Sequence, residues 1–241
     1  MRDPESLAGR VALVTGGSSG IGLAAVKACL DLGMEAAVLS RNPEGLPADL
    51  HSRVFSAACD VRKEDEVEDA VGRVIEKFGR IDLLVNAAGV SMPEPLYVES
   101  ISAELWDRVV ETNLRGTFLV CRAVLPRMKA EGKGLIINIL STGAYRSNPG
   151  NSLYSASKFG TRALTEALQE ETRDSGIKVS SISPGPVATN IWSHKKRTVT
   201  DEEKRRMLRP EDIGDIVAFL CLQPDYVHVD NITVTPKFPK V

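Results

Sequence analysis

The feature that most constrains this chain is a glycine cluster set between an apolar run and a helical pattern. Residues 11–14 form the apolar run, and Thr15-Gly16-Gly17-Ser18-Ser19-Gly20-Ile21-Gly22 follows it directly. From 21 to 32 the apolar positions recur with helical spacing, and Gly33 ends the pattern. A strand, a glycine-rich turn and a helix in this order predict a phosphate-binding site, because the first N–H groups of a helix are free to bind an anion.

Strand and helix patterns alternate along the rest of the chain. We expect strands at 35–39, 54–59, 81–85, 135–139, 178–182 and 231–235, and helices at 63–78, 103–111, 114–130 and 153–174. This alternation predicts an α/β fold with a doubly wound parallel sheet of the Rossmann type, because parallel strands need long crossover connections. Helices would cover both faces, residues 1–241 would form a single domain, and ligands would bind beyond the carboxyl ends of the strands.

The charge balance argues against a polyanionic partner. The 241 residues include 30 Lys and Arg against 32 Asp and Glu, a formal net charge of -2. We therefore expect a small-molecule ligand, and neither nucleic acid nor a membrane as partner. No apolar run approaches the roughly 18 residues of a spanning helix, and the start MRDPESLAG lacks the apolar core of a signal peptide.

The cysteines bear on location and on metal binding. Cys29, Cys59, Cys121 and Cys221 are widely spaced and include no C-x-x-C pair. This pattern predicts buried free thiols in a reducing compartment and no metal site. The expected location is the cytoplasm.

Further motifs follow the glycine turn in a fixed order. The turn has the spacing T-G-x-x-x-G-x-G, and after it come Asp60-Val61, Asn86-Ala87-Ala88-Gly89, Asn113, Ser141, Tyr154-x-x-x-Lys158, Pro184-Gly185 and Thr189. In this order the chain resembles the short-chain dehydrogenase/reductase family over almost its whole length. The resemblance implies an oxidoreductase that transfers a hydride between nicotinamide and a carbonyl or secondary alcohol. A reductase of ketone or 3-oxoacyl-type substrates is the favoured interpretation.

Two alternatives for the function stay open. One is an NAD-linked alcohol dehydrogenase that works in the oxidative direction. The other is a catalytically idle relative that binds a dinucleotide as a structural or regulatory ligand. The joint presence of Asn113, Ser141, Tyr154 and Lys158 argues against an idle chain.

The glycine turn and five later segments supply the candidate cofactor-binding residues. Gly16 allows a tight bend, Gly20 lets the backbone approach a pyrophosphate, and Gly22 lets the helix pack closely on the strand. The resemblance implies that Asp60 binds the adenine; the alternative is that Asp60 caps the helix beginning near Lys63. The candidate set is Gly16, Ser18, Ser19, Gly20, Ile21, Gly22, Ser40, Arg41, Asp60, Val61, Asn86, Ala87, Ala88, Gly89, Tyr154, Lys158, Pro184, Gly185, Val187 and Thr189.

The roles of the later motifs come from the resemblance alone. It implies that Val61 lines the adenine pocket and that residues 86–89 support the central sheet beside the cofactor. Pro184, Gly185, Val187 and Thr189 would flank the nicotinamide. The alternative for Pro184-Gly185 is an ordinary turn of the chain.

The end of the second strand bears on the choice of cofactor. An NAD site usually carries an acidic residue there to hold the free ribose hydroxyls, but the run here is Val38-Leu39-Ser40-Arg41-Asn42. Ser40 and Arg41 could instead bind a 2′-phosphate. NADP(H) is therefore the favoured cofactor. NAD(H) stays open, because Ser19 stands where the family often has a basic residue, and Arg41 has the alternative of an ordinary surface charge.

The chemistry needs a proton donor and a hydrogen-bond donor on the reacting oxygen. Tyr154 is the candidate acid/base, and Lys158 lies one helical turn away, where its ammonium and an oxidised nicotinamide would favour the phenolate. Ser141 follows a strand and could hold the substrate oxygen. The resemblance implies that Asn113 carries a water-linked proton path from the lysine.

The substrate site is the least defined by sequence. By analogy its border is an apolar set comprising Ser91, Met92, Pro93, Ser141, Thr142, Gly143, Asn151, Pro186, Ile191 and Trp192. The segment 191–209 interrupts the alternation of strands and helices, and it carries His194, Lys195, Lys196, Arg197, Arg205 and Arg206. It is interpreted either as a solvated surface helix or as a mobile lid over the substrate.

The C-terminal part departs from the family pattern. Many members end in a strand with a Gly-Gly pair at a subunit interface, whereas this chain has no such pair and continues into Pro236-Lys237. A homodimer through the helices that contain Asn113 and Tyr154 is expected, and a homotetramer is the alternative.

Overall fold

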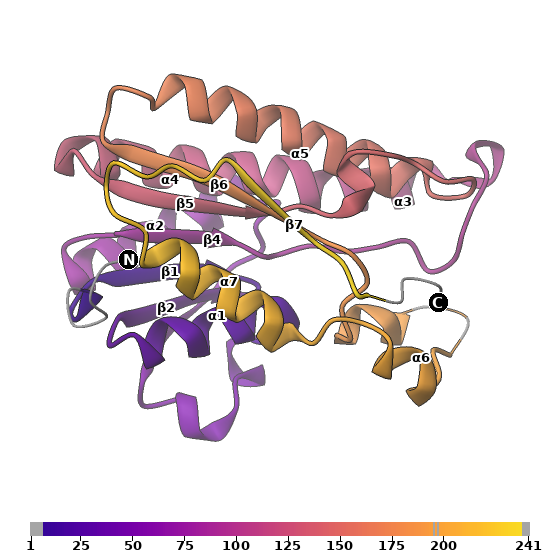
Figure 1. Cartoon of the computed structure of the whole chain (residues 1–241), viewed down its shortest axis with the longest axis horizontal. Coiled ribbons are helices and arrows are strands. Elements are labelled where there is room, and N and C mark those ends of the chain that lie inside the picture. The colour runs from indigo at the N-terminus through magenta and orange to yellow at the C-terminus, as the bar shows by residue number, and fades with distance from the viewer. Residues whose placement is uncertain (1–6, 195, 197, 238–241) are drawn as a thin grey trace.

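Seven parallel strands form one sheet in the order β3-β2-β1-β4-β5-β6-β7. Figure 1 shows the sheet running through the middle of the molecule with helices on both sides. This computed structural model describes residues 7–194, 196 and 198–237. The strands are β1 (Val11–Thr15), β2 (Glu35–Ser40), β3 (Val54–Ala58), β4 (Leu83–Asn86), β5 (Gly134–Ile139), β6 (Ile177–Pro184) and β7 (Asn231–Val234). Every neighbouring pair is parallel, so the carboxyl ends of the strands meet at one edge.

The central strands are apolar on both faces because helices cover both faces. All five residues of β1 are buried, with Ala12 and Val14 in one core and Val11 and Leu13 in the other. The first core packs under α1 (Gly20–Asp31) and α7 (Pro210–Cys221). The second packs under α2 (Glu64–Phe78), α4 (Gly116–Glu131) and α5 (Ser152–Glu171). This arrangement confirms the doubly wound α/β fold expected from the alternation of patterns.

The observed bounds differ from the expected ones in a few places. The helices expected at 103–111 and 114–130 are continuous, because α3 (Ala103–Val110) passes into α4 through a π-turn at Glu111–Arg115. In the described part of the segment 191–209, the regular elements are a turn at Asn190–His194 and the short helix α6 (Asp201–Arg205). Helix α7 was not expected from the sequence. Short turns of 3-10 type lie at Pro43–Gly45, Ala48–Leu50, Val98–Ser100 and Thr142–Ala144.

The topology marks one edge of the sheet for ligands. From β1 the chain first builds β2 and β3 on one side and then β4 on the other, so the strand order reverses between β1 and β4. Open α/β sheets bind ligands in the crevice at such a reversal. Within the described part of the chain, no helix is both long and apolar enough to cross a membrane. Lys195, Arg197 and the first six residues lie outside the described residues.

Candidate active site

The glycine turn after β1 is held against the loop after β4. Thr15 Oγ1 accepts hydrogen bonds of 3.1 Å from both Ala87 N and Ala88 N. Gly16 has a φ of +66°, and a Cβ there would lie 2.9 Å from Ala88 Cα. At Gly22 an added Cβ would lie 2.3 Å from Gly16 O. Side chains at these two positions would therefore push the turn away from the loop and from α1.

The N-terminus of α1 lies in this turn. Ser19 precedes the helix, and its hydroxyl does not cap it. The first N–H groups of a helix have no partner within the helix and carry the positive end of its dipole, which suits a pyrophosphate. On the far side, a Cβ on Gly20 would lie 3.2 Å from Thr189 Cβ. The first N–H groups of α1, with Thr189 of the segment after β6 close by, thus fit the pyrophosphate of a dinucleotide.

The end of β2 presents hydroxyls and a guanidinium. Ser40 is buried, and its Oγ lies 2.8 Å from Ser18 Oγ in the glycine turn. Asn42 N also donates to Ser40 Oγ, at 3.2 Å. Arg41 is exposed beside this pair. The structure therefore brings together residues of the first turn and the second strand that the sequence separates by about twenty positions.

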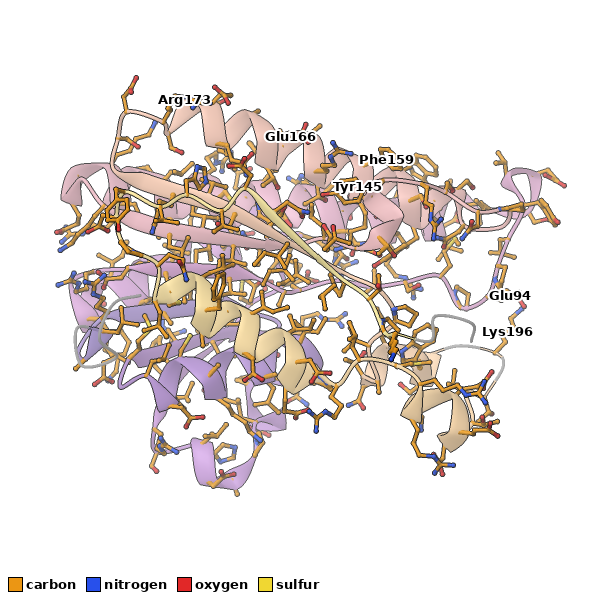
Figure 2. The ribbon with its side chains drawn as sticks, viewed as in Figure 1. Glu94, Tyr145, Phe159, Glu166, Arg173 and Lys196 are labelled. Carbon is orange, nitrogen blue, oxygen red and sulfur yellow. The ribbon has the colours of Figure 1, made fainter. Side chains whose placement is uncertain are left out.

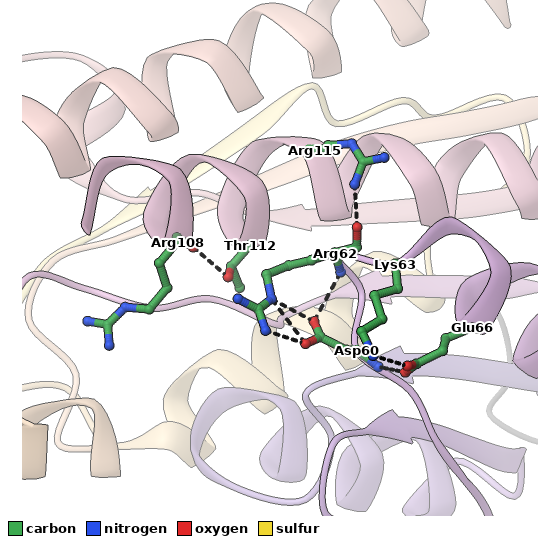
Figure 3. Close-up of polar contacts among 7 residues, drawn as sticks. All are labelled: Asp60, Arg62, Lys63, Glu66, Arg108, Thr112 and Arg115. Atoms are coloured by element: carbon green, nitrogen blue, oxygen red, sulfur yellow. Dashed lines mark hydrogen bonds and ion pairs between the residues drawn. The ribbon is translucent and has the colours of Figure 1, made fainter. Parts of the chain in front are cut away.

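Asp60, after β3, is held by a residue that sequence reasoning did not select. Arg62 donates from its Nε to both carboxylate oxygens, at 3.0 Å, and from its Nη2 to Oδ2 at 2.5 Å (Figure 3). These hydrogen bonds lower the pKa of Asp60, and the charges of Arg62 and Arg41 add to the effect. Arg115 donates to the backbone oxygen of Arg62, which ties the loop to the π-turn.

The alternative that Asp60 caps the following helix is wrong. Helix α2 begins at Glu64, and the residue at its cap position, Lys63, makes no side-chain hydrogen bond that caps the helix backbone. The Asp60 carboxylate instead accepts from Arg62 N, before the helix starts, at 3.1 Å. An aspartate with an arginine two positions later is a pattern that sequence reasoning could have used.

Three of the four predicted catalytic residues meet beyond the end of β5. Ser141 lies two residues past that strand, and Tyr154 and Lys158 lie one turn apart on α5. Ser141 and Tyr154 lie close together around Gly143, where an added Cβ would lie 3.4 Å from Ser141 Oγ and 3.5 Å from Tyr154 Cε1. Ser141 Oγ accepts from Gly143 N at 3.0 Å. Lys158 Nζ donates to Ile139 O at 2.8 Å and lies 6.0 Å from the centroid of the Tyr154 ring.

Burial governs the ionisation of this group. It raises the pKa of Tyr154, and the hydrogen bond to Ser141 only partly opposes the rise. It also lowers the pKa of Lys158 to about 8, because the low-dielectric interior disfavours the ammonium. The expected lowering of the Tyr154 pKa by Lys158 is not found, since among the protein's own groups burial has the larger effect. At neutral pH the site therefore holds a neutral phenol beside a mostly protonated amine.

Asn113 lies in the π-turn and is fixed by its side chain. Its Oδ1 accepts from Val90 N at 2.8 Å, and its Nδ2 donates to Val90 O and Ser157 Oγ, both at 3.0 Å. Its backbone oxygen accepts the hydroxyls of Thr117 and Thr161. These contacts hold the loop after β4 against the helix that carries Tyr154. The water-linked proton path stays a prediction.

The residues expected around the substrate fall into two groups. Met92 is buried in a small core with Val109 and Leu153, against which Tyr154 packs, and Asn151 Nδ2 donates to Ser155 Oγ at the start of α5. The others are partly exposed in the loops after β4, β5 and β6; they are Ser91, Pro93, Ser141, Thr142, Gly143, Pro186, Ile191 and Trp192.

Comparison with known proteins bears on this arrangement. The family model described as short chain dehydrogenase matches residues 10–200. The chain belongs to this family. An uncharacterised oxidoreductase of Staphylococcus epidermidis is 34% identical over 230 residues, which cover 94% of this chain and 97% of that protein.

Solved structures of short-chain dehydrogenases share the fold over nearly the whole chain. A metagenomic short-chain oxidoreductase in complex with NADP is 31% identical, with a TM-score of 0.83 over 96% of this chain and 99% of that chain. A 3-ketoacyl-(acyl-carrier-protein) reductase of Brucella melitensis, complexed with NADH, is 28% identical, with a TM-score of 0.86 over 97% and 100%. This short-chain dehydrogenase is thus an oxidoreductase with a Rossmann-type site for a nicotinamide dinucleotide.

A hollow of about 500 Å³ lies at the opposite edge of the sheet, where β1, β4, β5 and β6 begin. Several of its charged groups are paired with one another or with neighbours, among them Glu170 with Arg173 and His228 with Asp230. It contains none of the predicted catalytic residues.

Proposed function

We propose that this short-chain dehydrogenase is an NADP(H)-dependent reductase of ketone or 3-oxoacyl-type carbonyl groups. The grouping of Ser141 and Tyr154 around Gly143, beside Lys158 and beyond the end of β5, is the observation that supports the proposal. It lies at the edge of the sheet where the glycine turn offers a phosphate cradle. When bound, the nicotinamide supplies or accepts the hydride.

The protein's own residues supply the proton and orient the oxygen. Ser141 would donate a hydrogen bond to the substrate oxygen, which holds the carbonyl in place and stabilises negative charge on it. Tyr154 would then give that oxygen a proton, and its raised pKa keeps the phenol protonated at neutral pH, which suits reduction. Lys158 would keep positive charge nearby while anchored on Ile139 O.

The cofactor preference rests on the end of β2. Ser18 and Ser40 lie side by side, Arg41 is adjacent, and no carboxylate stands in the run 38–42. A 2′-phosphate would accept hydrogen bonds from the hydroxyls and a charge-assisted one from the guanidinium. Asp60 would accept a hydrogen bond from the adenine with a carboxylate lone pair that does not accept from Arg62. NAD(H) is the alternative cofactor.

The segment 191–209 is proposed as a lid over the substrate. Its base is pinned near the expected nicotinamide contacts, because Ala188 N donates to Leu208 O at 2.8 Å and Leu208 N donates to Pro186 O at 2.9 Å. Trp192 Nε1 also donates to Val187 O at 2.6 Å. A lid of this kind would exclude water from the reacting groups.

Assembly and location complete the proposal. Phe118 on α4 and Phe159 on α5 are 42% and 40% exposed, which supports a homodimer through these helices, with a homotetramer as the alternative. The four cysteines are buried free thiols, which suits the reducing cytoplasm.

The test is a panel of ketones, 3-oxoesters, 3-oxoacyl thioesters and alcohols, assayed with each nicotinamide cofactor by the absorbance of its reduced form. We expect reduction of carbonyls with NADPH. Tyr154→Phe should bind the cofactor normally and lose turnover by a factor on the order of 10² or more. Oxidation of alcohols with NAD alone would establish the alternative dehydrogenase. Cofactor binding with no turnover of any compound would establish an idle relative.

A further inference from the structure

The loop after β4 contacts both the loop after β5 and the segment after β6. Leu96 N, in the loop after β4, donates to Gly150 O in the loop after β5, at 2.9 Å. Lys196 N, in the segment after β6, donates to Pro93 O at 2.9 Å. The side chain of Lys196 reaches the neighbouring residue as well, with Nζ 2.6 Å from Glu94 Oε1. Figure 2 shows Glu94 and Lys196 facing each other at the end of the molecule that carries these loops.

The position of this contact follows from the order of the strands. In the sheet, β5 lies between β4 and β6. A direct contact between the loop after β4 and the segment after β6 therefore joins the loops on either side of β5. Ser141 lies just beyond the carboxyl end of β5, and a Cβ on Gly143 would lie within 3.5 Å of both Ser141 Oγ and Tyr154 Cε1. The Glu94–Lys196 contact thus joins the two loops that flank the loop carrying Ser141.

The segment that carries Lys196 is anchored more firmly at its base than at this outer point, where one backbone hydrogen bond to Pro93 O and one ion pair hold it. At its base, Leu208 is hydrogen-bonded to Pro186 and Ala188, and the segment's own side chains Val199 and Met207 are buried. At the outer point the side chains of Lys196 and Glu94 are 69% and 34% exposed. Exposed ion pairs contribute little free energy and weaken with salt, so this contact can open without disturbing the base.

We propose that Glu94 is a specificity-determining residue, which by pairing with Lys196 closes the outer side of the substrate site and favours compact carbonyl substrates over extended ones. The inference rests on the proposed carbonyl reduction and names its substrate class. A short ester fits beneath the closed contact, whereas the same acyl group on a long carrier arm must thread through it. Turnover of the long substrate then requires the pair to open.

The test compares one reacting group in two sizes. The compact substrate is a methyl 3-oxobutanoate, and the extended one is the 3-oxobutanoyl thioester of pantetheine, which is also uncharged. The readout is the ratio of the two kcat/KM values with NADPH. Glu94→Gln should lower this compact-to-extended ratio about twofold to fivefold, the range that an exposed ion pair supports. Lys196→Gln should do the same, and the double variant should add nothing further.

Two controls make the result specific. Glu99→Gln removes a carboxylate from the same exposed loop and should leave the ratio unchanged. Molar salt should lower the wild-type ratio toward that of Glu94→Gln without changing the variant. An unchanged ratio in Glu94→Gln, with both substrates turned over, would overturn the inference while leaving the proposed function intact.

Hydrogen exchange separates the inference from the proposed function. Amides of residues 198–208 should exchange about twofold to fivefold faster in Glu94→Gln than in the wild type with NADPH bound. Faster exchange supports the closing contact even if neither substrate is reduced, a result that would refute only the proposed function. Equal exchange in the two proteins would overturn the inference.

Discussion

At the scale of single residues, Lys158 combines a cost in stability with a proposed role in the reaction. Its side chain is 6% exposed, and burial lowers its pKa to about 8. Its hydrogen bond to Ile139 O holds the amine in place but brings no negative charge. At neutral pH the native protein therefore keeps an ammonium in an environment that disfavours it, beside Tyr154. A charged side chain that is kept buried at a cost in stability is a candidate functional residue.

Lys158→Met should abolish turnover and yet stabilise the fold. The pKa falls from 10.5 to about 8 on folding, so the charged amine opposes folding at neutral pH. Its removal should raise the free energy of unfolding by about 1–3 kcal/mol there. Between these two pKa values the unfolded state binds more protons, so wild-type stability should rise with pH. The difference in unfolding free energy between the variant and the wild type should therefore disappear at alkaline pH. Urea unfolding at neutral and alkaline pH measures this; a variant less stable at neutral pH would contradict it.

Cofactor choice depends on Ser40 and Arg41. We expect the protein to prefer NADPH to NADH by about tenfold to a hundredfold, the effect of one charge-assisted hydrogen bond. Arg41→Ala should remove most of the preference without harming turnover at saturation. Ser40→Asp should favour NADH, because a carboxylate repels the phosphate and accepts from the ribose hydroxyls.

Titration of each protein with both cofactors measures these preferences. Arg53→Ala is a matched control, since Arg53 is exposed just before β3, at the other edge of the sheet. Equal affinities for NADPH and NADH in the wild type would refute the assignment of Arg41.

The sequence identified Ser141, Tyr154 and Lys158 from their order, and the structure brings them together. It did not identify Arg62, which holds Asp60, or Ser157, which holds Asn113. Ser157 lies between two motif residues, but its partner is 44 positions away, and no local pattern predicts such a pairing. Hydrogen bonds between side chains far apart in the sequence were therefore the part of the site that the sequence could not predict.

At the scale of elements, a buried polar chain joins the sheet to the helix of the active site. Asn86 Nδ2 in β4 donates to Asn138 Oδ1 in β5 at 2.9 Å. Asn138 Nδ2 in turn donates to Thr165 Oγ1 in α5, also at 2.9 Å. All three side chains are buried, so each hydrogen bond replaces one that water would otherwise make.

Asn138→Leu should cost about 1–3 kcal/mol of unfolding free energy, because Asn86 loses an acceptor and Thr165 a donor. Combining it with Thr165→Val should cost less than the sum of the single changes, since the second change removes one orphaned group. Urea denaturation of the four proteins gives the coupling. Strict additivity would show that the two side chains do not act together.

The helix pair α3–α4 shows why bounds were harder to predict than elements. The sequence indicated two helices with a break near Asn113, whereas the structure keeps one rod and absorbs an extra residue in the π-turn. Gly116 fits there because a Cβ would lie 2.7 Å from Val61 Cγ2. The sequence thus located a change in the helical hydrogen-bond pattern near Asn113, but the helix continues through it.

At the scale of the whole molecule, the sheet was predictable because strands buried on both faces are short continuous apolar runs. Helix α7 was missed although Ile213, Val217 and Leu220 have helical spacing and are buried. Its pattern follows the charged segment 191–209 and was assigned to no element. It packs so closely on α1 that a Cβ on Gly214 would lie 2.8 Å from Ala24 O. The arrangement of the loops over the site depends on contacts between distant segments, which spacing does not reveal.

The central claim is hydride transfer from NADPH to a carbonyl carbon. The most direct measurement uses NADPH carrying deuterium at both C4 positions of the nicotinamide, with a ketone that the panel identifies as a substrate. We expect the product alcohol to contain one deuterium on the carbinol carbon, detected by mass spectrometry, and Tyr154→Phe to form it at a rate lower by a factor on the order of 10² or more. A product alcohol without deuterium, or NADPH consumption without any alcohol, would contradict the account.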